Sequence, residues 1–255
     1  MHAYREYPPH PLLAAHVACL WTSHMAPGDG APPVRRRILP DNCIDILWQD
    51  RAPLGFVAGM MSRAHHVEAA QPVRTVAVRF LPGAARAFFD LPLHALQDLH
   101  PLLPDLWPRT DAERLAAALW ERDRDDDQRL AVLERALLAR LRTAAPAPAD
   151  LLVRAAVGRL EASAGTLRID TLARELGVSR QHLAALFRER VGLSAKTFAM
   201  VCRFRRASAL LPRTDERIDW AGLAAACGYY DQAHLIQDFR LFADATPDAF
   251  ARRGR

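Results

Sequence analysis

The stretch LARELGVSRQHLAALFRER, residues 172–190, has a second copy in LAAACGYYDQAHLIQDFRL, residues 223–241. Each copy begins with Leu-Ala and reaches a Gly five residues after that Leu. Ser179 or Asp231 then stands directly before a helical pattern that carries His-Leu and, later, Phe-Arg. The second copy has one extra residue between its Gly and its Asp. The repeat predicts a helix, a short turn and a second helix, twice over.

These features have a physical meaning in a helix-turn-helix unit. A Gly supplies the backbone freedom that a tight turn between two helices needs. A Ser or Asp side chain at the start of the second helix accepts a hydrogen bond from its otherwise unpaired N–H groups. In such units the N-terminal turns of the second helix enter the major groove of DNA, and the helix dipole there favours phosphate.

The second helix of each copy divides into an anchoring face and an outward face. Leu183, Leu186 and Phe187 anchor the first of these helices, and Leu235 and Phe239 anchor the second. The predicted DNA contacts are the outward positions and helix starts: Arg180, Gln181, Ala184, Ala185 and Arg188 in the first copy, and Gln232, Ala233, Ile236, Gln237 and Arg240 in the second. Gln pairs with adenine and Arg with guanine, while Ala and Ile contact the methyl group of thymine.

The distribution of charge supports a polyanionic partner for this part of the chain. The net charge is +5, and residues 151–255 hold 17 Lys and Arg against 11 Asp and Glu. The first 150 residues hold 17 basic and 18 acidic residues, so the positive excess lies in the C-terminal part. The alternative is a bundle of ordinary amphipathic helices with a solvated basic surface. Two matched copies favour double-stranded DNA, bound through two adjacent major-groove segments.

The chain divides into a strand-rich part and a helical part. TAAPAPAD, residues 143–150, predicts a linker because it is rich in Ala and Pro. Short runs rich in Val, Ile, Leu and aromatic residues predict strands at 16–25, 35–40, 43–48, 54–59, 65–69 and 74–80. After the linker, helical patterns occupy 151–163, 169–176, 180–190, 195–211, 219–227, 232–242 and 247–252.

We therefore predict an α+β protein of three parts. Residues 1–105 form a small β-barrel or sandwich, with flanking helices at 82–89 and 92–99. Residues 106–145 form a helical connector, whose leucine stripe packs within the chain or forms a dimer seam. Residues 146–255 form an all-α DNA-binding domain with two helix-turn-helix units.

The C-terminal part resembles the AraC-type transcriptional regulators over roughly residues 151–253. Both copies of the repeat carry the resemblance, together with FAMVCRFRRASALL at 198–211 and ATPDAF at 245–250. The resemblance implies seven helices, with the two units joined by a long central helix. There are two departures from the family pattern. Ala185 stands where members often have Arg, and Asp244 stands where Gly is usual, although Asp tolerates left-handed backbone better than most residues.

The N-terminal part is similar to an uncharacterised sensor-like domain of some AraC-type regulators. YPPHPLLAAHVACLW at 7–21, ILPDNCIDILW at 38–48 and VRFLPGAARAFF at 78–89 carry this similarity. It implies a regulatory domain, cupin-like in fold, without specifying a ligand. The predicted effector-binding residues are the strand aromatics Trp21, Trp48, Phe56 and Phe80, whose alternative role is to fill the core.

Two alternative functions each have a few residues in their favour, a metal-binding barrel and a redox-responsive regulator. His65, His66 and Glu68 invite a metal site, but adjacent strand residues point to opposite faces and no H-x-H spacing occurs. Cys19 and Cys43 would serve a redox switch. The four cysteines form no C-x-x-C pair, and buried structural thiols are the default for such scattered cysteines. A reactive-cysteine DNA-repair function fits poorly for the same reason.

We predict a cytoplasmic, sequence-specific transcription regulator that is not an enzyme and has no cofactor, metal ligand or catalytic residue. The chain has no apolar run of about 18 residues and no signal-peptide layout, so we expect no membrane partner. Reduced, scattered cysteines suit the cytosol. Further partners considered are a small-molecule effector, a second copy in a homodimer and, for an activator, RNA polymerase.

Overall fold

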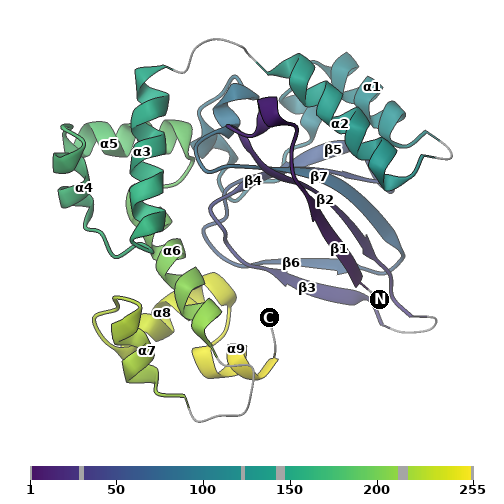
Figure 1. Ribbon diagram of the computed structural model, residues 1–255. Coiled ribbons are helices and arrows are strands. Elements are labelled where there is room, and N and C mark those ends of the chain that lie inside the picture. Colours follow the sequence, from purple (N-terminus) through teal and green to yellow (C-terminus); the bar gives the residue numbers. More distant parts are fainter. Residues whose placement is uncertain (1, 29–31, 122–123, 142–146, 212–217, 254–255) are drawn as a thin grey trace.

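The computed structural model describes residues 2–28, 32–121, 124–141, 147–211 and 218–253. Strands fill the first part of the chain and helices the rest, which confirms the predicted α+β class (Figure 1). None of the helices in these ranges is long and apolar enough to cross a membrane.

The strands form an open five-stranded antiparallel sheet and a separate two-stranded ribbon. The sheet has the order β1 (His2–Tyr7), β2 (Val17–Met25), β7 (Val73–Phe80), β4 (Ile44–Gln49) and β5 (Ala52–Ala58). The ribbon pairs β3 (Val34–Ile38) with β6 (His65–Ala69). The prediction of a closed small barrel is wrong. Among the described strands, β1 and β5 remain the edges of an open sheet, and β3 and β6 pair only with each other. The strand β1 was not predicted.

One face of the five-stranded sheet carries the core of the N-terminal part. Residues paired across strands share a face, so Trp48 lies beside Val76 and Ile46 beside Val78, all fully buried. Four short 3₁₀ helices accompany the sheet: η1 (Pro11–Leu13), η2 (Ala85–Ala87), η3 (Leu93–Leu96) and η4 (Leu103–Asp105). Each buries a Leu or Ala in this core.

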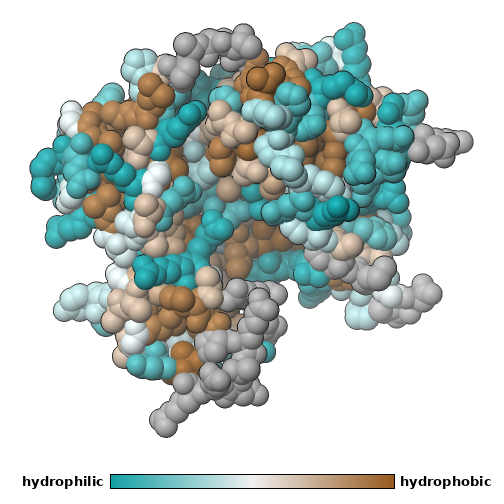
Figure 2. Space-filling model, in the orientation of Figure 1, coloured by the Kyte–Doolittle hydropathy of each residue, from teal (hydrophilic) through white to brown (hydrophobic). Residues whose placement is uncertain are grey.

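The predicted connector helices pack onto the same core. They are α1 (Arg109–Leu119) and α2 (Asp126–Arg140), which lie side by side against the sheet (Figure 1). Leu130, Leu133 and Leu137 of the leucine stripe are buried, and hydrophilic side chains predominate on the outward side of this pair (Figure 2). The stripe is thus covered within the chain, and a dimer seam through it would require these leucines to leave the core.

The C-terminal part consists of helices throughout its described residues. They are α3 (Pro148–Ala162), α4 (Ile169–Glu175), α5 (Arg180–Arg190), α6 (Ala195–Leu210), α7 (Trp220–Ala226), α8 (Gln232–Ala243) and α9 (Pro247–Arg253). The predicted linker is shorter than expected, since α3 begins at Pro148, a position where proline costs no hydrogen bond. Residues 143–146 of that linker lie outside the described residues.

Candidate nucleic-acid interface

The first copy of the repeat folds as α4, a short turn and α5. Gly177 turns the chain with φ of 68°, a left-handed conformation that favours glycine. The Ser179 hydroxyl then accepts a hydrogen bond from the His182 N–H at 3.1 Å and caps α5. Leu183 and Phe187 are fully buried beneath α5, so the helix is anchored through the face that the sequence predicts.

The second copy folds as α7, a turn one residue longer, and α8. Gly228 is again left-handed, with φ of 74°, and Asp231 accepts a hydrogen bond from the His234 N–H at 2.8 Å. Asp244 ends α8 with φ of 48° and ψ of 37°, so the aspartate adopts the left-handed conformation expected at this departure from the family pattern. The two copies therefore share the positions of the capping residue, the left-handed glycine and the anchoring side chains.

Nine of the ten predicted DNA contacts have exposed side chains, and Ile236 is half-buried. In the first copy, Gln181, Ala184, Ala185 and Arg188 all lie on the exposed side of α5. Arg180 forms an ion pair with Asp170 of α4 at 2.6 Å, which holds its charge at the start of α5. The ten residues form two largely exposed surfaces on equivalent sides of α5 and α8, here called the reading faces.

The central helix α6 joins the two units through Arg203, a residue that was not predicted as functional. One Arg203 guanidinium nitrogen donates a hydrogen bond to the Gly165 carbonyl, in the turn before α4, at 3.2 Å. The same guanidinium lies 5.5 Å from the ring centre of Tyr229, in the turn before α8. Thr166 also lies so close to Gly228 that a methyl group there would clash with it. Arg203 thus contacts both turns at once.

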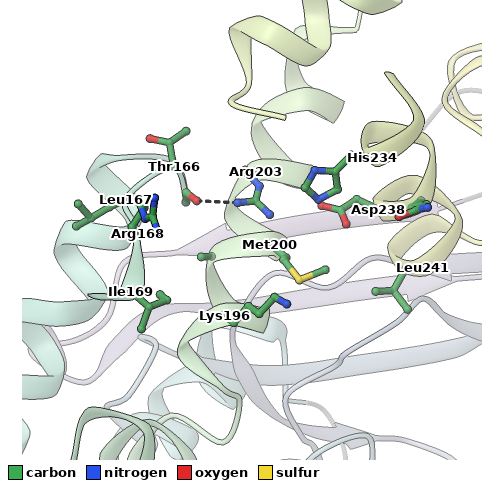
Figure 3. A pocket seen from close by; sticks show the side chains of 13 residues that line it. Thr166, Leu167, Arg168, Ile169, Lys196, Met200, Arg203, His234, Asp238 and Leu241 are labelled. Atoms are coloured by element: carbon green, nitrogen blue, oxygen red, sulfur yellow. Dashed lines mark hydrogen bonds between the residues drawn. The ribbon is translucent and has the colours of Figure 1, made fainter. Parts of the chain in front are cut away.

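A buried carboxylate in the second unit, Asp238, completes this cluster. Asp238 is 2% exposed and lies on α8 (Figure 3), where the first copy has the apolar Leu186. Burial raises the pKa of Asp238, whereas Arg203, His234 and a hydrogen bond with Tyr229 act to lower it. An acidic residue on an anchoring face was the one signal in the sequence that could have revealed the cluster.

Comparison with known protein families supports this assignment of the repeat. Residues 172–253 match the model of a family described as a helix-turn-helix domain. The chain carries an AraC-type helix-turn-helix domain. AraC-type domains of this kind bind DNA and belong to transcription regulators. Residues 5–101, before the AraC-type domain, match a family described as a domain of unknown function, DUF6597.

Solved structures to which this chain is similar include a transcriptional regulator with an AraC-type DNA-binding domain from Chromobacterium violaceum. It is 28% identical, covers 43% of this chain and 98% of its own, and has a TM-score of 0.36. ToxT from Vibrio cholerae is 10% identical, with 98% of both chains covered and a TM-score of 0.45. The xylose-binding activator XylR is 18% identical over 50% of this chain and 39% of its own, with a TM-score of 0.36. No curated protein matches the chain.

The four aromatic residues predicted to bind an effector do not come together. Trp48 and Phe80 are fully buried in the core on one face of the sheet. Trp21 lies on the opposite face with Cys19 and Ala77, and Phe56 pairs with Leu47 on that side. The structure thus divides the four residues between two faces.

A buried ion pair lies beside Trp21 on this second face. Arg79 donates two hydrogen bonds to the Asp45 carboxylate at 3.1 and 3.0 Å, and the Trp21 indole N–H donates a third at 3.1 Å. Burial raises the pKa of Asp45, while Arg79 opposes the shift. Arg79 also approaches the carboxylates of Asp41 at 3.4 Å and Glu6 at 4.0 Å, so its charge is balanced within the protein.

The residues considered for a metal site or a redox switch have other neighbours. His65 stacks on His100, His66 approaches Asp244 at 3.6 Å, and Glu68 pairs with Arg35 at 2.8 Å. Among the described residues, no three His, Cys, Asp or Glu side chains are placed to share a metal ion.

The two cysteines considered for a redox switch are separated by a strand. Cys19 of β2 and the start of β4, next to Cys43, lie on either side of β7. Strands lie about 4.8 Å apart, so the two backbones are separated by about 10 Å, beyond the roughly 7 Å that a disulfide tolerates. Burial also raises the pKa of Cys19 to about 11 and that of Cys43 well above its usual value.

The N-terminal part contacts both helix-turn-helix units near the C-terminal ends of their second helices. In the first unit, the His94 imidazole of η3 lies 3.3 Å from the Arg188 carbonyl of α5. In the second, the Arg37 guanidinium of β3 donates a hydrogen bond to the Ala243 carbonyl of α8 at 2.7 Å. Asn42, between these sites, donates a hydrogen bond to the Phe198 carbonyl of α6 at 3.1 Å. One domain thus touches both units and the helix that joins them.

Proposed function

We propose that this protein is a sequence-specific transcription regulator that reads two adjacent major-groove segments with α5 and α8. The observation that carries the proposal is the pair of exposed reading faces, placed equivalently on two copies of one structural unit. Besides the helix-start residues Arg180 and Gln232, each face carries one Gln and one Arg that suit adenine and guanine: Gln181 with Arg188, and Gln237 with Arg240.

We further propose that the N-terminal domain regulates DNA binding by setting the relative position of the two units. Its contacts with the Arg188 and Ala243 carbonyls lie at the far ends of α5 and α8, away from the N-terminal turns that enter DNA. A ligand or a second protomer that binds one arrangement of the units better than another would shift the population towards it. The identity of an effector, a homodimer and a contact with RNA polymerase stay predictions from the sequence.

The proposal is tested by selecting DNA sites from a random pool and footprinting the protein on the promoters next to its own gene. We expect a site with two half-sites about one helical turn apart. Gln237→Ala should then cost about 1–3 kcal/mol at one base position and relax the preference there. A uniform loss of affinity on all sequences would instead make Gln237 a backbone contact. Failure to select any preferred sequence would contradict sequence-specific regulation.

The matched variant in the first unit is Ala185→Gln, because Ala185 occupies the position that Gln237 holds in the second copy. Ala185 is exposed, so the larger side chain requires no repacking. If the two faces are equivalent, this variant should gain a base preference in the other half-site, measured with the same selected pool. No change in either half-site would mean that this part of α5 does not meet a base edge.

A further inference from the structure

A pocket of about 550 Å3 lies between the two helix-turn-helix units. Its walls come from the turn before α4, from α6 and from α8 (Figure 3). Lys196 and Met200 of α6 lie between Arg168 on one side and His234 and Asp238 on the other. The lining is therefore basic and partly apolar, with one buried acid.

The charges that line the pocket differ in how far they are neutralised. Arg203 lies beside the buried carboxyl group of Asp238 and acts to lower its pKa, so the two charges partly offset each other. Arg168 and Lys196 are exposed, and neither forms an ion pair with any residue that the structure describes. The exposed lining of the pocket therefore keeps these two positive charges without an acidic partner, which suits an anionic ligand.

The position of the pocket identifies the kind of anion. Gln237 belongs to the reading face of α8 and also lines the pocket, so the two surfaces are continuous. On one side of a duplex, two successive major-groove segments are separated by sugar–phosphate backbone. If α5 and α8 enter such segments, that backbone must pass the middle of the domain, where α6 and the pocket lie.

We propose that this pocket holds the DNA backbone between the two half-sites, with the Lys196 ammonium and the Arg168 guanidinium bound to its phosphates. The proposal rests on the proposed function, because it requires both reading helices to sit on one duplex. Such contacts fix the register of the protein and carry no sequence information. A lysine acts here as a point charge that tolerates small differences in phosphate position.

The sequence offers a direct probe, because Lys196 is the only lysine in the chain. An amine-selective acylating reagent can therefore modify Lys196 and the N-terminal amine alone. We expect duplex DNA carrying the selected site to slow acylation of Lys196 at least severalfold while the N-terminal amine reacts as before. Mass spectrometry of the digested protein gives both rates. An unchanged rate at Lys196 in a saturated complex would overturn the proposal.

A second measurement uses the dependence of affinity on salt. Each phosphate contact that is lost should reduce the slope of log affinity against log salt concentration by about 1. We expect this reduction for Lys196→Gln, no reduction for Lys196→Arg, and an unchanged base preference for both. The control is Arg109→Gln, which removes one exposed charge from α1, far along the chain in the other domain. An equal reduction for the control would mean that net charge alone sets the slope, and would overturn the assignment.

The two proposals fail in different ways. If the wild-type protein selects no DNA site, the proposed function itself is wrong. If it selects a site but Lys196 stays reactive and Lys196→Gln keeps the wild-type slope, only the backbone-binding pocket is wrong. Because Lys196 is exposed, its replacement should leave the thermal unfolding midpoint unchanged.

Discussion

The two copies of the helix-turn-helix unit have the same caps and anchors but belong to different cores. Phe187 of the first copy is part of a cluster that also contains Trp48 of the sheet and Leu133 of α2. Phe239 of the second copy packs with Phe204, Phe242 and neighbours in a separate cluster. The repeat therefore produces one unit whose core is merged with that of the N-terminal part and one whose core is mostly its own.

Two segments with similar local sequence can therefore pack into different cores and be attached to the rest of the protein by different contacts. The first unit packs closely on the N-terminal part, because the turn at Gly192 lies against Leu93 and Met60, which belong to the same core as Phe187. The second unit is attached through α6 and through polar contacts such as that of Arg37. We infer that the second unit is the one whose position changes more readily.

The largest expected effect comes from removing the equivalent anchor in each copy. Phe187→Ala and Phe239→Ala each leave a cavity and should cost about 3–5 kcal/mol. Phe187→Ala should lower protection from hydrogen exchange in the sheet as well as in α4 and α5. Phe239→Ala should lower protection mainly in α7, α8 and α9. If both variants lose protection over the same residues, the two cores unfold as one cooperative unit, and the distinction between the two units is wrong.

A smaller effect is expected from Arg37, which holds the second unit to the ribbon. Arg37 donates a hydrogen bond to the Ala243 carbonyl and lies 4.8 Å from the ring centre of Phe250. Arg37→Gln should therefore weaken the attachment of α8 and α9 by about 1 kcal/mol. Hydrogen exchange should quicken at the end of α8 and in α9. Arg36→Gln, an exposed neighbour on the same strand, is the control and should leave that exchange unchanged.

The smallest effect concerns pH and Asp238, which has no counterpart in the first copy. Burial raises the pKa of this carboxyl in the folded protein, although Arg203, His234 and Tyr229 oppose the shift. The folded state then binds the proton more tightly than the unfolded chain does. The contribution of Asp238 to stability is therefore complete below the ordinary carboxyl pKa and is lost as pH rises through its folded pKa.

The variant Asp238→Asn should remove this dependence. Relative to the wild type, its free energy of unfolding should increase as the pH rises above about 4. Urea unfolding of both proteins at several pH values measures the difference in free energy. Hydrogen exchange of the α8 amides at the same pH values shows whether it arises in this helix. Parallel profiles for the two proteins would show that Asp238 titrates normally and that the buried acid does not distinguish the second unit.

The helices of the C-terminal part could be predicted closely because their end signals are local. Ser179 and Asp231 cap the helices that follow them, and α5 spans the predicted residues 180–190. The strand β1 was missed because HAYREY carries no run of apolar residues. The open sheet was missed because the pairing of β3 with β6 joins segments far apart in sequence, which no local pattern specifies.

The candidate site divides in the same way. The outward residues of α5 and α8 could be placed from helical periodicity, and their exposure agrees with it. The contacts of Arg203 with Gly165 and Tyr229 join three segments that are distant in sequence, so no spacing rule reveals them. Trp48 and Phe80 fill the core, because aromatic residues on a strand bury large apolar area wherever a sheet face is covered.

The close approach at Gly192 also has a consequence for building hybrid regulators. Gly192 has φ of 97°, and a Cβ there would lie 3.0 Å from the Leu93 carbonyl oxygen. In a chimera joined at residues 143–150, this α5–α6 turn would face the N-terminal domain of another protein, whose surface need not leave room for it. Such a fusion should need the 81–96 segment to be transplanted together with the DNA-binding part. The segment that must be transferred between regulators is therefore larger than the part that follows the linker.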